Sequence, residues 1–127
     1  MPVTIVHTPS APAPIGPYSQ AVRAGDTIYV SGVIALDPET GQLVDGGVAA
    51  QAERVFASLA AIASAAGASL SNAVKVTIYL TDLASFAVVN AQMVRVFHAP
   101  FPARATVGVK ELPRSAAVEI DAVLFLG

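Results

Sequence analysis

The sequence contains no cysteine and no tryptophan, and it has few charged side chains. Without cysteine, a disulfide, a thiolate nucleophile and a cysteine-ligated metal are all excluded. Charged residues make up only 13% of the 127 residues, well below the share found in a typical soluble domain. Hydrophobic residues make up 54%, and the mean hydropathy is +0.64. This composition predicts that part of the surface is covered, either by further copies of the chain or by a membrane.

A membrane-spanning helix and a nucleic-acid partner are both disfavoured. The segment 55–74 has no formal charge, but it is mostly alanine and serine, contains Gly67 and Asn72 and lacks a flanking basic cluster. The N-terminus shows no basic region followed by an apolar stretch, so we expect no secretory signal and a cytoplasmic location. A net charge of −2 argues against nucleic acid as the main partner, because such a partner favours a basic patch.

Hydrophobic periodicity divides the chain into short strands and two helices. Apolar residues alternate with polar ones at 74–80, whereas steps of three and four residues at 48–66 and 83–98 indicate helices. The predicted strands are 4–7, 18–22, 27–34, 74–80, 103–109 and 118–124. The order β-β-β-α-β-α-β-β, within a single domain of residues 1–127, predicts an α+β fold in which both helices cover one face of a mixed sheet.

Charged residues interrupt the apolar strand patterns near the end of the chain. Arg104 lies in the predicted strand 103–109, and Glu119 and Asp121 alternate with apolar residues in 118–124. A charge in such a run is costly unless it is paired or used. We expect all three side chains on the sheet face away from the helices. There, Arg104 either forms an ion pair with one of the two carboxylates or binds the carboxylate of a ligand.

Four further residues are candidates for a site, and each has a structural alternative. Asn90 lies on the apolar stripe of the second helix, where a buried amide either clamps nearby backbone or faces a ligand. Tyr18 follows a glycine–proline corner and is either a packing residue or a ligand contact. Ser31 and Gly32 end a strand, and Gly32 either admits a ligand to the backbone or marks a bend.

Several common kinds of site are missing from the sequence. No glycine-rich phosphate loop follows a predicted strand. Ser31 lacks the glycine that precedes the serine of a nucleophile elbow. His7 and His98 have no partner at the spacing of metal ligands, so we expect no metal site.

Five segments together resemble the reactive intermediate deaminase family, also called Rid or YjgF. The segments are Ala13-Pro14-Ile15-Gly16-Pro17-Tyr18-Ser19-Gln20-Ala21, Tyr29-Val30-Ser31-Gly32, Val74-Lys75-Val76-Thr77-Ile78-Tyr79-Leu80, Phe86 to Asn90, and Pro102-Ala103-Arg104 with Val118-Glu119-Ile120. The last combination is specific, and the resemblance extends over nearly the whole chain.

The resemblance implies a chorismate-mutase-like fold whose last strand is inserted centrally, so that 110–115 is not a hairpin turn. It also implies a homotrimer with ligand clefts between subunits. The implied activity is hydrolysis of reactive 2-enamine and 2-imine acids, such as 2-aminoacrylate and 2-iminobutanoate, to 2-keto acids and ammonia, for which we expect no metal or cofactor. By position, Arg104 would hold the substrate carboxylate and Glu119 would activate water. The residues that would line or order the cleft are Tyr18, Ser31, Gly32 and Asn90.

Thr106 departs from the family pattern, because archetypal members have a cysteine there. An iminium carbon is already electrophilic, so its hydrolysis needs positioning and one base rather than a sulfur atom. The backbone carbonyl of Thr106 would still orient water, while the change bears on the shape of the cleft and on which imines fit. Two alternatives follow: a deaminase for a different imine, and a non-catalytic relative that binds small carboxylates or acts in translation, on RNA or as a chaperone.

Overall fold

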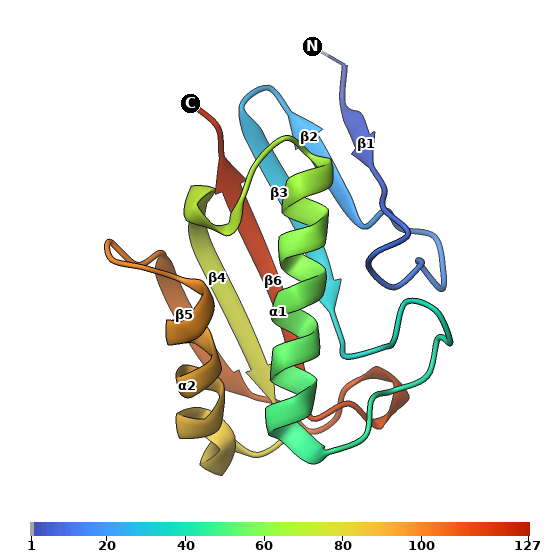
Figure 1. Cartoon of the computed structure of the whole chain (residues 1–127), viewed down its shortest axis with the longest axis vertical. Helices are drawn as coiled ribbons and strands as arrows, with labels where there is room; N and C mark the ends of the chain where they lie inside the picture. Colours follow the sequence, from blue (N-terminus) through green and yellow to red (C-terminus); the bar gives the residue numbers. More distant parts are fainter. Residues whose placement is uncertain (1) are drawn as a thin grey trace.

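The sheet is mixed, and the last strand of the chain lies inside it. In the computed structural model, which describes residues 2–127, six strands pair in the order β1-β2-β3-β6-β4-β5 (Figure 1). They are β1 (Thr4–Val6), β2 (Ala21–Ala24), β3 (Thr27–Val33), β4 (Ala73–Leu80), β5 (Ala103–Gly108) and β6 (Val118–Phe125). β6 is antiparallel to both β3 and β4, whereas β4 is parallel to β5. The central position of β6 confirms that 110–115 is not a hairpin turn.

Both helices pack on one face of the sheet, which confirms the predicted α+β arrangement (Figure 1). α1 (Gly47–Ala65) contacts β3 and β6, and α2 (Phe86–Val96) contacts α1. The apolar stripe of α1 includes Val55, Leu59 and Ile62, which are all buried in the core. We call the side of the sheet under the helices the helix-covered face and the other side the open face.

The second helix is shorter than the sequence pattern predicts. Leu83–Ser85 forms a 3₁₀ turn, and Asp82 accepts a hydrogen bond from the Ala84 N–H at 2.9 Å. Asp82 therefore caps this turn, and the α-helix starts only at Phe86. The helix ends at Val96 rather than at 98, because the residue that follows already has an extended backbone.

The first hairpin also begins later than predicted. β2 starts at Ala21 instead of at 18, and the turn to β3 consists of Gly25 and Asp26 alone. Gly25 has a φ of 63°, which a two-residue hairpin turn requires and glycine adopts at low cost. The residues just before β2 stay outside the sheet because they belong to the proline-rich loop.

The buried amide of Gln20 holds this proline-rich loop in place. Its Nε2 donates to the carbonyl oxygens of Thr8 at 3.0 Å and Pro12 at 2.8 Å, and its Oε1 accepts from the Thr8 N–H at 2.8 Å. A buried amide with its polar groups paired in this way rigidifies its surroundings. Gln20 thereby fixes the loop that contains Tyr18 and places this residue near the end of β3.

The strand register separates Arg104 from the carboxylates. β4 pairs Val76 with Arg104, and Val76 is fully buried under the helices, so Arg104 lies on the helix-covered face. β4 also pairs Tyr79 with Glu119, and Tyr79 is out of phase with Val76, so Glu119 lies on the open face. Asp121 shares that face. The prediction that Arg104 lies beside Glu119 and Asp121 is therefore wrong, and an ion pair between them within one chain is excluded by the sheet.

The open face is apolar in many places although no helix covers it. Tyr29 of β3, Val107 of β5 and Phe125 of β6 are 54%, 39% and 47% exposed there. Val107 and Phe125 are among the apolar residues behind the high mean hydropathy. Within residues 2–127, no helix is both long enough and apolar enough to span a membrane.

Candidate functional site

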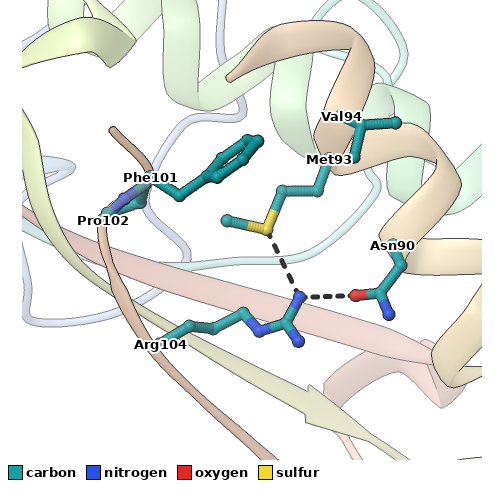
Figure 2. A pocket seen from close by; sticks show the side chains of 6 residues that line it. All are labelled: Asn90, Met93, Val94, Phe101, Pro102 and Arg104. Atoms are coloured by element: carbon teal, nitrogen blue, oxygen red, sulfur yellow. Dashed lines mark hydrogen bonds between the residues drawn. The ribbon is translucent and has the colours of Figure 1, made fainter. Parts of the chain in front are cut away.

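One face of α2 holds the guanidinium of Arg104. Phe86, Asn90 and Met93 are spaced four and three residues apart, which places them on one side of the helix. Arg104 Nη1 donates to Asn90 Oδ1 and lies 3.6 Å from the sulfur of Met93 (Figure 2). The guanidinium carbon is 5.1 Å from the centre of the Phe86 ring, a cation–π distance. Arg104 is thus oriented before any ligand arrives.

Arg104 forms part of an open cleft of about 500 Å³. The other lining residues are Asn90, Met93, Val94, Phe101 and Pro102 (Figure 2). β5 is an edge strand, so Arg104 remains exposed, and both of its hydrogen-bonding contacts to α2 use Nη1. A guanidinium also carries donors on Nε and Nη2, and this fork matches a carboxylate. The cleft therefore combines one fixed cation with largely apolar walls.

Asn90 proves to be a partner of Arg104 rather than a clamp on the backbone. Its side chain is half-buried, and its Oδ1 accepts the hydrogen bond from the guanidinium. The sequence pattern indicated Asn90 as a candidate but treated Phe86 and Met93 only as apolar packing residues. Their spacing from Asn90 was the available signal, because a helix face that carries an amide can be shared by other groups that contact the same cation.

Glu119 lies on the open face, half-buried at the start of β6. Burial raises the pKa of its carboxyl group, and the negative charge of Asp121 raises it further. The carboxyl group lies directly against Gly32: a Cβ atom at this position would be 2.9 Å from Glu119 Cδ and closer still to Oε2. Gly32 therefore makes room for Glu119.

Ser31 and Gly32 occupy an irregular part of the sheet. The pairing of β3 with β6 shifts register between Val30 and Val33, so these two residues do not follow the regular ladder. Ser31 Oγ donates to the carbonyl oxygen of Ser19 at 2.6 Å, which ties β3 to the loop before β2. Ser31 thus has a clear structural role, and Gly32 is presented to Glu119 by the bulge.

Tyr18 lies close to this bulge. Together with Ser31 and Gly32, it lines a small pocket of about 40 Å³ beside the buried Gln20. The ring is 49% exposed, and its hydroxyl accepts a long hydrogen bond of 3.4 Å from the Ile15 N–H. Tyr18 is therefore placed at the surface near Gly32 and remains accessible to a ligand.

The predicted site residues form two groups within one chain. Arg104 and Asn90 make the group on the helix-covered face, at the outer edge of the sheet. The second group surrounds the end of β3 and consists of Tyr18, Ser31, Gly32 and Glu119. In residues 2–127 no cluster of three or more histidine, aspartate or glutamate side chains has the geometry to hold a metal ion.

Thr106 belongs to the same sheet face as Arg104, since β4 pairs it with the buried Ile78. Its Oγ1 is buried and has no hydrogen-bond partner in the part of the chain that the structure describes. A buried hydroxyl that loses water without gaining a partner costs about 1–3 kcal/mol. The Thr106 hydroxyl thus weakens the fold of a single chain.

Thr106→Val is expected to increase the free energy of unfolding by about 1 kcal/mol, because valine has the same shape without the unpaired hydroxyl. Chemical denaturation of the two proteins measures this difference. Thr77→Val is the matched control, since Thr77 is a half-buried strand residue on the open face. A loss of stability in Thr106→Val would show that the hydroxyl has a partner in the folded protein.

Comparison with known proteins identifies the family. The model of the family described as Endoribonuclease L-PSP, which is the Rid or YjgF family, matches residues 8–125. The chain belongs to the Rid family. Its relatives include two proteins named 2-iminobutanoate/2-iminopropanoate deaminase. The one from Dermatophagoides farinae is 44% identical over 125 residues and covers 98% of both chains. The one from Bos taurus is 46% identical over 123 residues, which are 97% of this chain and 90% of that protein.

The Rid fold is confirmed by solved structures. The crystal structure of RidA from the Antarctic bacterium Psychrobacter sp. PAMC 21119 is 48% identical and has a TM-score of 0.93. The match covers 96% of this chain and 98% of that one. Several further Rid-family relatives are named only as RutC family proteins, without a stated reaction. The comparisons therefore support an imine deaminase of the Rid family and leave its residues and substrate to the chemistry of the site.

Proposed function

We propose that this Rid-family protein hydrolyses reactive 2-imino acids and their enamine tautomers to 2-keto acids and ammonia. The observation that carries the proposal is Arg104, an exposed guanidinium oriented by α2 at one end of an open cleft of about 500 Å³. Such a fork suits the carboxylate of a 2-imino acid. The names of the relatives in Dermatophagoides farinae and Bos taurus support the same reaction.

Glu119 supplies the base in this proposal. It takes a proton from water as the oxygen of that water bonds to C2 of the imine, and the C=N bond becomes a single bond. Glu119 returns that proton to the nitrogen, which gives a carbinolamine. Glu119 then takes the proton of the new hydroxyl group as the C=O bond forms and the C–N bond breaks, and this second proton leaves with the nitrogen as ammonia, so that the 2-keto acid remains. Burial raises the pKa of Glu119, so its carboxylate binds a proton more tightly and is a better general base near neutral pH.

The reacting cleft in this proposal lies between two copies of the chain. Arg104 and Glu119 are on opposite faces of one sheet, so one chain alone does not bring both to the same substrate. A second copy that places its Glu119 against the Arg104 cleft completes the site. The low charge and the apolar side chains of the open face support assembly, and the family resemblance implies a homotrimer.

A coupled assay tests the proposal. A threonine or serine dehydratase generates the imine, and release of the 2-keto acid is timed with and without this protein. Faster release is expected, and its absence with a well-folded oligomer would contradict the deaminase function. Binding of a 2-keto acid without turnover would instead identify a non-catalytic carboxylate-binding protein. Salt-dependent retention of RNA would agree with the endoribonuclease description of the family.

Gly32→Ala is expected to lower kcat/KM by about tenfold to a hundredfold, because the new methyl group displaces the carboxyl group of Glu119. The coupled assay gives this value, and a thermal unfolding curve establishes that the variant is folded. A variant with wild-type kcat/KM would show that the position of Glu119 against Gly32 does not matter for turnover.

A further inference from the structure

A tyrosine and a second carboxylate lie beside Glu119, and the proposed reaction uses neither. Glu119 and Asp121 are alternate residues of β6, so both point to the open face, with their Cα atoms about 7 Å apart. Tyr79 of β4 lies opposite Glu119 in the ladder. Its hydroxyl donates a hydrogen bond diagonally across the ladder, to Asp121 Oδ2 at 2.9 Å.

The Tyr79 hydroxyl fixes Asp121 on this face of the sheet. The hydrogen bond to Asp121 raises the pKa of Tyr79, and burial and the two nearby carboxylates raise it further. The phenol therefore keeps its proton and remains a donor throughout the neutral range. As a result, the side chain of Asp121 is held on the open face near Glu119 instead of turning away into solvent.

Few other charges on the open face act on Glu119. The other titratable side chains that the described strands place there are Lys75 of β4 and Tyr29 of β3, both opposite Val123. Val123 is two residues beyond Asp121, so Lys75 and Tyr29 lie on the far side of Asp121 from Glu119. The edge strand β5 contributes only alanine and valine side chains to this face. Asp121 is therefore the one other carboxylate that the described strands place on the open face with Glu119.

We propose that Asp121 is a positioning residue for the deaminase reaction: held by the Tyr79 hydroxyl, it sets a second negative charge beside Glu119 and makes Glu119 the stronger base. This inference rests on the proposed function of Glu119. A neighbouring negative charge disfavours the ionised form of a carboxyl group, so Asp121 makes Glu119 bind a proton more readily. A base of higher proton affinity transfers the proton of the attacking water more effectively. Asp121 itself touches neither substrate nor water in this scheme.

The pH dependence of kcat/KM tests the role of Asp121 in the assembled protein. Turnover needs ionised Glu119, so kcat/KM falls on the acid side as Glu119 is protonated. Asp121→Asn keeps an acceptor for Tyr79 but removes the charge. This acid limb is expected to move to lower pH in the variant, while the plateau falls by about two- to tenfold with little change in KM. Tyr79→Phe is expected to move the limb in the same direction by less.

Two controls separate this role from a structural one. Asp121→Glu restores the charge and is expected to restore the acid limb. Asp45→Asn removes one exposed charge before α1 and is expected to leave the profile unchanged. An acid limb in Asp121→Asn that coincides with the wild type would overturn the proposal, as would a profile that Asp121→Glu fails to restore.

A titration of the Glu119 carboxyl carbon by NMR decides the same point without turnover. The midpoint is expected to be lower in Asp121→Asn than in the wild type, and equal midpoints would overturn the proposal. Failure of the deaminase function has a different signature, since the wild-type protein would then show no acceleration in the coupled assay. The NMR midpoints still report in that case whether Asp121 acts on Glu119.

Discussion

Arg104→Ala is expected to lower kcat/KM for a 2-imino acid by about 10²–10⁴-fold. A carboxylate that binds a guanidinium fork forms two charge-assisted hydrogen bonds, each worth about 1.5–3 kcal/mol, and every 1.4 kcal/mol corresponds to tenfold. The loss includes orientation, because Arg104 is held by Asn90 and by the ring of Phe86 before the substrate binds. The coupled assay with a dehydratase measures this change.

The control variants separate three possible causes of this loss: the missing pair of guanidinium hydrogen bonds, the missing positive charge, and unfolding. Arg104→Lys keeps the charge but presents a single ammonium group, so most of the loss is expected to persist. Arg95→Ala removes an exposed cation from the last turn of α2, the helix that orients Arg104, and is expected to retain wild-type kcat/KM. An Arg104→Ala protein that is folded and fully active would remove Arg104 from the mechanism.

Most of the fold follows from the sequence because hydrophobic periodicity is strong in this chain. The apolar stripes of α1 and α2 predict both helices, and the alternation in β4 and β6 predicts the buried face of the sheet. The ends of the elements follow less well. The 3₁₀ turn after Asp82 and the proline-rich loop held by Gln20 depend on hydrogen bonds that periodicity does not encode.

The face of β5 is the clearest case that the sequence left undetermined. Alanines and a valine alternate there with Arg104, Thr106 and a glycine, so neither side is distinctly apolar. We expected the alanines and the valine to face the helices. The face is decided by the register with β4, which sets Arg104 next to Val76. The open face accepts the alanines and the valine because it is itself apolar in places.

The contact between Gly32 and Glu119 lies equally beyond sequence analysis. From the sequence, Gly32 either admits a ligand to the backbone or marks a bend in the strand. The structure shows that a side chain of the same protein, Glu119, approaches it first. The bulge between β3 and β6 creates this contact, and a bulge adds one residue whose place the alternation of side chains does not reveal.

Because the Arg104 group and the Glu119 group lie on opposite faces of one sheet, the proposed activity depends on assembly. The orientation of Arg104 is complete within one chain, through α2, and so is the environment of Glu119, through Gly32 and Asp121. In the proposed mechanism, assembly only has to bring the Arg104 cleft of one copy against Glu119 of another. In this proposal, a folded monomer retains carboxylate affinity at Arg104 and lacks turnover.

Glu119→Gln is expected to lower kcat by about 10²–10⁴-fold while 2-keto acid binding remains, because glutamine keeps the shape but accepts no proton. Stability is expected to hold. The pKa of Glu119 is raised in the folded chain, so the folded state binds the proton more tightly than the unfolded state, and stability falls as pH rises through that raised pKa. At neutral pH the ionised carboxylate thus opposes folding, and glutamine removes this cost. Turnover, equilibrium binding and thermal unfolding together measure these effects.

Mixed oligomers of Glu119→Gln and Arg104→Ala test whether the two residues act across copies. In a random mixture, about a quarter of the sites between neighbours combine an intact Arg104 from one chain with an intact Glu119 from the next. Activity is therefore expected to recover to about a quarter of the wild-type value, although each variant alone is nearly inactive. A site within one chain would give no recovery, because every chain in the mixture lacks one of the two groups. Glu53→Gln, at an exposed position on α1, mixed with Arg104→Ala is the control. About half of its sites keep both groups, so about half of the wild-type activity is expected, and a lower value would show that Arg104→Ala chains disturb neighbouring sites.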